Sequence, residues 1–286
     1  MDELLEEAPP EPVADIKRLA YQLPLIVISD MLGVPAEDRD RIHEWSGAIG
    51  RSRGVVDEQR LIEAEQALAE FARYVAEIVD DLRRRSDRSS LVAAMLDAEQ
   101  EERLTQQELT SMFVFLLFAG HETTTNLIAN GLHDLLTRPE QWRRLCADPA
   151  AVAPAAVEEL LRFTSPVQLI QRVAVEDVSV HGVRIRPGRH VVGLLGAANR
   201  DPEAFERPDE LDVTRDKGPG HIDFGFGPHF CLGAALARLE GQVAFTTLAG
   251  RYPDMELAVD PDELVWGGNA MLRALETLPI RLVHPA

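Results

Sequence analysis

The chain has 286 residues, of which 45% are hydrophobic and 27% charged, so it can bury a sizeable core. Its formal net charge of −19 argues against a nucleic-acid partner, because nucleic-acid phosphates favour basic surfaces. The two cysteines, Cys146 and Cys231, are too few for a disulfide scaffold and lack the C-x-x-C spacing of zinc sites. With an acidic N-terminus and no apolar run long enough to cross a bilayer, the chain is expected in the cytoplasm and off the membrane.

Helices are expected along the N-terminal third of the chain, at residues 12–35, 35–50, 57–85 and 90–101. Gly33 and Pro35 act as stop signals for the first of them. The third has an apolar face that includes Leu61, Leu68 and Phe71, with charged residues opposite.

The longest helix is expected between Thr105, which has capping-box spacing to Glu108, and about Leu136. Its middle, residues 112–120, is apolar on every face, which predicts a buried segment with Phe113, Phe115 and Phe118 in the core. The sequence Ala-Gly-His-Glu-Thr at 119–123 follows directly. A helical glycine costs about 1 kcal/mol relative to alanine, and a buried carboxylate costs more. Such breaches of local rules are expected at functional sites.

Pro139 and Pro149 should open two further helices, the second ending near Phe163. Short strands are expected beyond Pro166, at residues 169–175, 178–180, 190–195, 255–257 and 278–282. The predicted fold class is mainly α with a small β portion (α+β), in a single domain over residues 1–286.

A Gly-rich loop, residues 224–233, places Cys231 just before an Ala-rich helix that runs from Ala234 to about Gly250. Gly225 and Gly227 would let a flat ligand approach the main chain closely. The start of the helix would favour a thiolate, which is a nucleophile or a metal ligand. Taken alone, the loop leaves open the alternative that Cys231 is a small buried hydrophobe.

Three features occur in order: Ala-Gly-His-Glu-Thr, the Glu159-Leu-Leu-Arg162 sequence, and the Cys231 loop. Together they resemble a cytochrome P-450 of the soluble bacterial type, and the resemblance extends along essentially the whole chain. It implies a bound haem b (iron protoporphyrin IX) with the Cys231 thiolate as axial ligand of the iron.

The resemblance also implies roles for other residues. Thr123 and its neighbour Glu122 would be catalytic, relaying protons during oxygen activation. Gly120 would open the helix locally beside the iron. The remaining positions implied to bind or line the haem are His229, Arg172, Phe224, Gly225, Gly233 and Ala119. The ordinary alternatives are a loop histidine at 229, a surface arginine at 172, a surface carboxylate at 122 and a threonine bonded to its own helix at 123.

Away from the haem itself, Glu159, Arg162 and Arg215 are implied to form a brace behind the cysteine loop. Without the resemblance, Glu159 and Arg162 would be read as a weak surface ion pair. Arg238 is a candidate for a basic docking face.

The implied activity is mono-oxygenation of a small organic substrate by O2. Electrons would come from NAD(P)H through a separate ferredoxin and reductase, because no flavin or nicotinamide fingerprint is present. A haem-binding remnant without turnover and a peroxide-driven oxygenase remain as alternatives. The resemblance begins late in the family's chain, so we expect an N-terminally truncated molecule that lacks the outer strands, a propionate-binding helix and a substrate-recognition loop.

Overall fold

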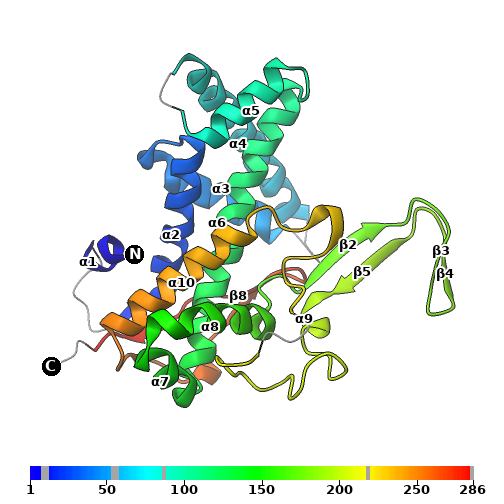
Figure 1. Ribbon diagram of the computed structural model, residues 1–286. Coiled ribbons are helices and arrows are strands. Elements are labelled where there is room, and N and C mark those ends of the chain that lie inside the picture. The colour runs from blue at the N-terminus through cyan, green and yellow to red at the C-terminus, as the bar shows by residue number, and fades with distance from the viewer. Residues whose placement is uncertain (8–12, 53–57, 86–87, 217–219, 284–286) are drawn as a thin grey trace.

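The computed structural model describes residues 1–7, 13–52, 58–85, 88–216 and 220–283. Its helices are α1 (Asp2–Glu7), α2 (Ile16–Leu32), α3 (Arg39–Arg51), α4 (Glu58–Arg84), α5 (Ser90–Gln100), α6 (Gln106–Leu136), α7 (Pro139–Ala147), α8 (Pro149–Thr164), α9 (Leu195–Ala198) and α10 (Ala234–Arg251). The predicted α+β class is confirmed, with α4 and α5 at one end of the molecule and α6 running through it (Figure 1). Among the described residues, no helix combines the length and apolarity needed to cross a membrane.

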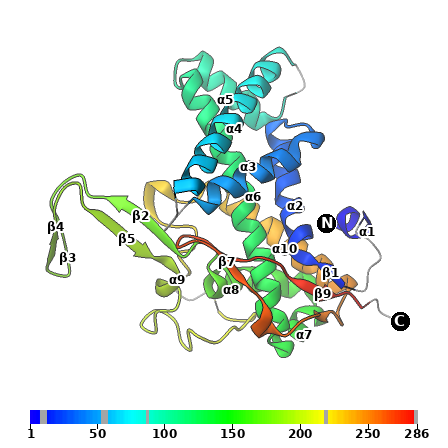
Figure 2. The same cartoon turned by 180° about the vertical axis from the view of Figure 1, so that it is seen from behind.

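Helix α6 is the central element, and α2, α4, α8 and α10 pack around it (Figures 1 and 2). The predicted capping box is present: the backbone N–H of Glu108 donates to Thr105 Oγ1 at 3.2 Å, and Glu108 Oε2 accepts from the backbone N–H of Thr105 at 2.8 Å. The predicted stop of α2 is also confirmed, since Gly33 ends it in the left-handed region at φ 72°. The local signals in the sequence therefore set the ends of both helices.

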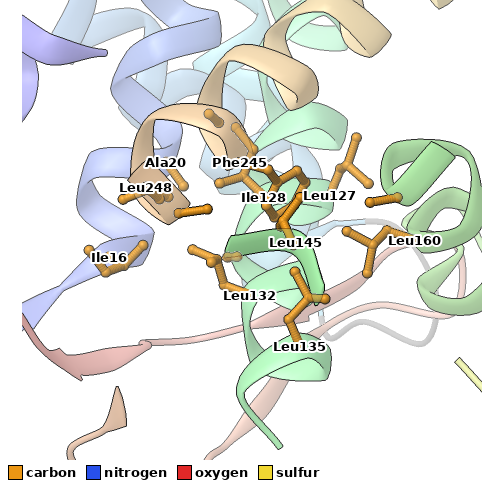
Figure 3. Close-up of a cluster of buried hydrophobic side chains, with 14 of the residues drawn as sticks. Ile16, Ala20, Leu127, Ile128, Leu132, Leu135, Leu145, Leu160, Phe245 and Leu248 are labelled. Atoms are coloured by element: carbon orange, nitrogen blue, oxygen red, sulfur yellow. The ribbon is translucent and has the colours of Figure 1, made fainter. Parts of the chain in front are cut away.

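Two hydrophobic clusters meet along α2 and α6. One joins α2, α3, α4 and α5 to the first half of α6. The other joins the second half of α6 to α2, α7, α8 and α10 (Figure 3). Its labelled members are Ile16, Ala20, Leu127, Ile128, Leu132, Leu135, Leu145, Leu160, Phe245 and Leu248. Burying each of these larger side chains contributes roughly 1.5–3 kcal/mol, so α6 is held from both sides.

All strand pairs are antiparallel. The strands are β1 (Val13–Asp15), β2 (Leu169–Val173), β3 (Val178–Val180), β4 (Val183–Ile185), β5 (His190–Leu194), β6 (Glu256–Leu257), β7 (Trp266–Gly268), β8 (Arg273–Leu275) and β9 (Pro279–Arg281). Strand β9 lies between β1 and β6 and so ties the start of the described chain to its end. The β2–β5 ribbon projects from the helices and carries the β3–β4 hairpin at its tip (Figure 1). Strands β1, β4, β7 and β8 were not predicted from the sequence.

Two burial predictions were wrong. On α6, Phe115 is 61% and Met112 38% exposed, because the packed helices cover only the side that carries Phe113. On α4, Leu61 and Leu68 are exposed, because the first turns bury Ala64 and Ala67 instead; the predicted Phe71 is buried. A run that is apolar on all faces therefore predicts a helix but does not show which face of the helix is buried.

The helix opening expected at Gly120 is also absent, since α6 is continuous there. A Cβ at this position would lie 2.8 Å from Ile28 Cγ1 of α2. Gly120 is thus explained by the close approach of α2 to α6.

Candidate active site

The Cys231 loop is folded by its own backbone. Gly225 and Gly227 take left-handed conformations, at φ 72° and 79°, which glycine adopts without strain. The N–H of Gly225 donates to the carbonyl of Ile222 at 2.8 Å, and the N–H of Cys231 donates to the carbonyl of Phe224 at 3.0 Å. These bonds hold Cys231 at a fixed point three residues before α10.

Cys231 is exposed, yet the atoms packed around its sulfur raise the pKa of the thiol by desolvation. The backbone N–H of Gly233 and the charge of Arg238 act in the opposite direction and only partly offset this. The start of the helix therefore acts toward a thiolate as expected, but burial outweighs it. Coordination to iron would remove the proton directly, because a metal-bound thiol is deprotonated.

The loop presents apolar side chains around the cysteine. Phe226 is 87% and Leu232 83% exposed, and Phe230 is also exposed. The loop lies between the middle of α6 and strand β2, where Val192 and other β2–β5 side chains are exposed as well (Figures 1 and 2). A soft sulfur donor ringed by apolar side chains fits haem, which is flat, largely apolar and bound through its iron.

The predicted propionate partners lie at the surface. His229 is exposed in the loop, and Arg172 is exposed on β2, where its NH1 donates to the carbonyl of Gln171 at 2.9 Å. Both side chains are accessible to a ligand carboxylate, and their role stays a prediction.

The predicted brace forms. Glu159 on α8 accepts from Arg162 Nε at 2.7 Å and from Arg162 NH2 at 2.8 Å. It also accepts from Arg215 Nε at 3.0 and 3.1 Å. Glu159 and Arg162 are almost fully buried, so this is an internal ion-pair network rather than the surface pair that the spacing alone would suggest.

Asn199 joins this brace to the cysteine loop. Arg162 NH1 donates to the Asn199 carbonyl at 2.9 Å, and the N–H of Ile222 donates to Asn199 Oδ1 at 2.9 Å. Asn199 Nδ2 donates to Ser165 Oγ at 2.9 Å. The role of Asn199 was missed from the sequence. Its partners, Arg162 and Ile222, are distant from it in the chain, and only the fold brings the three together.

A second ion pair supports the loop from α10. Arg238 donates to Glu158 at 2.6 and 3.0 Å, and its guanidinium lies 4.5 Å from the centre of the Phe224 ring. Burial alone would raise the pKa of Glu158, but hydrogen bonds from His221 and Arg238 outweigh it and lower the pKa to about 2. The guanidinium of Arg238 is therefore engaged by Glu158 and Phe224, which makes Arg238 a poorer candidate for a basic docking face.

On α6, the predicted proton-relay pair has two different settings. Thr123 Oγ1 donates to the carbonyl of Ala119 at 3.3 Å, within its own helix. Glu122 lines a cavity of about 510 Å³ together with Lys17 and His43. Burial acts to raise the pKa of Glu122, but His121, His43 and Lys17 favour the carboxylate and lower it overall. Successive helical residues point about 100° apart, so Glu122 and Thr123 face different sides of α6.

The helical fold and the exposed thiol can be compared with known proteins. A family model described as Cytochrome P450 matches residues 56–253. Polyketide biosynthesis cytochrome P450 PksS of Bacillus subtilis (strain 168) is 44% identical over 98% of this chain and 68% of its own length. Vitamin D(3) 25-hydroxylase of Pseudonocardia autotrophica is 42% identical over the same shares. The solved structure of CxnD, a cytochrome P450 enzyme for C–S bond formation in chuangxinmycin biosynthesis, superimposes with a TM-score of 0.92 at 38% identity, over 99% of this chain and 69% of CxnD.

The chain belongs to the cytochrome P450 family. It is a cytochrome P450 mono-oxygenase, an oxidoreductase whose cofactor is haem b. It spans about two thirds of the length of the relatives just named.

Proposed function

We propose that this protein is a haem-thiolate mono-oxygenase of one domain, in which Cys231 is the axial ligand of the haem iron. The observation that carries the proposal is the exposed Cys231 thiol within an apolar rim, on a loop fixed by its backbone and by Asn199. When bound, the haem supplies the oxygen-activating chemistry, in which thiolate donation favours O–O cleavage.

The residues around the loop would orient the cofactor. Phe224, Gly225 and Gly233 would lie against its proximal side, where Gly225 leaves no side chain in the way. His229 and Arg172 would each donate to a carboxylate of the cofactor, since charge-assisted hydrogen bonds of this kind are short and strong.

On the opposite side, α6 would deliver protons. Thr123 would donate from its hydroxyl after giving up its bond to Ala119, which at 3.3 Å is long for a hydroxyl donor. Glu122, held as a carboxylate by its basic neighbours, would return protons to Thr123 through water in the adjoining cavity. Ala119 would line this surface with only a methyl group, whereas Gly120 faces α2.

The substrate we propose is a small organic molecule, with electrons supplied by NAD(P)H through a ferredoxin and a reductase. The relatives act, by name, on chemically different molecules such as vitamin D3 and 6-deoxyerythronolide B. The proposed substrate class is therefore not limited to one carbon skeleton. One solved neighbour is titled as a complex with an acyl carrier protein, so a carrier-bound substrate falls within the proposal.

Turnover under ¹⁸O2 tests the proposal. The haem-loaded protein would be supplied with NADPH, a surrogate ferredoxin and reductase, and a substrate chosen by its perturbation of the haem spectrum. One labelled oxygen atom in the product is expected. Product formed only when hydrogen peroxide replaces the electron-transfer proteins would support the peroxide-driven alternative, and haem binding without product under either condition would support the remnant.

A further inference from the structure

A histidine from one helix meets a histidine and a carboxylate from another beneath the cavity described above. His43 lies on α3, and His121 and Glu122 lie on α6. One nitrogen or oxygen atom of each lies within 4.8 Å of the others, and His121 Nε2 lies 3.6 Å from Glu122 Oε1. His121 is fully buried. The site is therefore assembled by packing between two helices and is not a surface cluster.

One hydrogen bond of His121 shows which ring nitrogen carries a proton. Its Nδ1 lies 2.7 Å from the carbonyl oxygen of Leu117, which can only accept, so the ring proton is assigned to Nδ1. Nε2 is buried and has no hydrogen-bond partner among the described residues. An Nδ1–H held by a backbone carbonyl with Nε2 left free is the usual arrangement of a histidine that ligates a metal.

The second histidine, His43, also has a buried ring nitrogen without a hydrogen-bond partner among the described residues. His43 stacks on Tyr21 at a ring-centre distance of 4.1 Å, and its Nδ1 is buried without a partner in the described part of the chain. A ring nitrogen that no other described group engages can serve as a metal ligand.

Other charged residues also line the cavity. One of them, Lys17, donates through Nζ to the carbonyl of Leu275. The other charged residues that line the cavity are Asp15, Arg18, Arg51 and Glu276. His121 Nε2 and Glu122 Oε1 face each other at 3.6 Å, and a metal cation between them could be bound by both atoms.

We propose that His43, His121 and Glu122 form a binding site for a divalent zinc ion. Two imidazoles and one carboxylate are a known ligand set for zinc, and the 510 Å³ cavity would supply water as the fourth ligand. Bonds of about 2.0–2.2 Å place tetrahedral ligand atoms about 3.3–3.6 Å apart. The pair His121–Glu122 already has this spacing, and the His43 atom, within 4.8 Å of both, would have to move closer to complete the site.

Zinc at this site would occupy the carboxylate of Glu122. If Glu122 delivers protons as proposed above, zinc would inhibit turnover; this consequence rests on the proposed function, whereas zinc binding itself does not.

Competition between the haem-loaded protein and a chromogenic zinc chelator tests the site directly. One zinc ion per chain is expected, together with a higher melting temperature when zinc is present. His43→Phe keeps the stack on Tyr21 but removes a ligand, and it should weaken zinc binding at least about 100-fold, because changes in the outer shell alone cost 10–100-fold. Glu122→Gln should weaken it comparably, and it conserves volume if the first variant fails to fold.

The matched control is His181→Asn, a change at an exposed turn where φ is 47° and asparagine is tolerated. It should leave zinc affinity unchanged. X-ray absorption at the zinc edge should show only nitrogen and oxygen ligands. A stoichiometry of zero, equal affinity in His43→Phe, Glu122→Gln and the parent, or sulfur in the shell would overturn the proposal. A normal haem-thiolate spectrum in the same preparation would show that the proposed function had survived such a failure.

Discussion

Asn199 Oδ1 accepts a hydrogen bond of 2.9 Å from the backbone N–H of Ile222. This bond links the ion-pair network on α8 to the loop that carries Cys231, since the Asn199 carbonyl also accepts from Arg162. The cysteine is thus positioned from behind by a buried polar network, and the loop and the network should fail together.

Asn199→Ala should therefore destabilise the fold and weaken haem binding. Asn199 is fully buried, and its loss leaves the Ile222 N–H without a partner and removes the Asn199 amide that donates to the Ser165 hydroxyl. A buried N–H without a partner costs about 1–3 kcal/mol. Urea unfolding and haem titration would measure both effects. Asp209→Ala, at an exposed ion pair with Arg200, is the control and should change neither. An Asn199→Ala variant with unchanged stability and unchanged haem affinity would contradict the link between the network and the loop.

Arg215→Met tests the brace itself. It leaves the buried carboxylate of Glu159 with only one of its two arginines, and breaking a buried pair costs about 3–5 kcal/mol. Arg207→Met removes an exposed arginine that pairs with Glu210 and should cost under about 1 kcal/mol. Chemical denaturation of the two variants side by side measures the difference. Equal stabilities would show that the network is not needed for the fold.

Gly120→Ala should destabilise the protein by about 1–3 kcal/mol, because the new methyl group would meet Ile28 at 2.8 Å. In an Ile28→Ala background the same change should become neutral or favourable, since alanine is the better helix former. Gly50→Ala on α3 is the control: nothing lies within 4 Å of a Cβ there, so it should stabilise by about 0.5–1 kcal/mol. Thermal unfolding gives all the values. No rescue by Ile28→Ala would rule out this explanation of Gly120.

Glu240 predicts a pH dependence of stability. Its carboxyl is buried on α10, and desolvation raises its pKa to about 7, which Thr124 offsets only in part. Because the folded pKa lies above the unfolded value, this group's contribution is fully present below pH 4.5 and is lost as the pH rises through 7. Glu240→Gln abolishes that loss, so its stability relative to the parent should rise by on the order of 3 kcal/mol between pH 4 and pH 8.

Urea unfolding at several pH values measures the difference for Glu240→Gln. The exposed Glu263→Gln is the control and should run parallel to the parent. A pH-independent difference between Glu240→Gln and the parent would show that Glu240 is ionised in the fold.

Thr123→Ala should separate electron consumption from product formation. The variant loses only the hydroxyl that we assign to proton delivery, so NADPH oxidation should continue while product falls by roughly 100-fold, the lower end of general acid–base effects. Thr125→Ala, two residues on in the same helix, is the control, since its hydroxyl donates to the His121 carbonyl at 2.8 Å. Equal product yields from the two variants would remove Thr123 from the relay.

The sequence predicted much of the helical framework, because capping residues, prolines and glycines act locally. Thr105 with Glu108, Pro149 and Gly33 each marked a helix end that the structure confirms. Burial could not be read in the same way: Phe115 belongs to a run that is apolar on every face, and tertiary packing alone decides which face is covered.

In the candidate site too, features that are local in sequence could be predicted and contacts between distant residues could not. The loop around Cys231 and the Glu159–Arg162 pair are local in sequence, so they could be found from spacing. Asn199 and His43 act on residues distant in the chain, and a lone asparagine or histidine carries no spacing signal. Gly120 gave a real signal that was assigned to the wrong cause, since a glycine required for helix packing looks the same in sequence as one required for an opening.

The most direct test of the account is the absorption spectrum of the reduced, CO-bound protein. A haem held by the Cys231 thiolate should show the strongly red-shifted Soret band of thiolate ligation, and Cys231→His should lose that shift while retaining haem. Cys146, the other cysteine, is half-buried, and Cys146→Ala should leave the spectrum unchanged. A parent protein that takes up no haem, or whose Soret band lies where histidine ligation places it, would contradict the central claim.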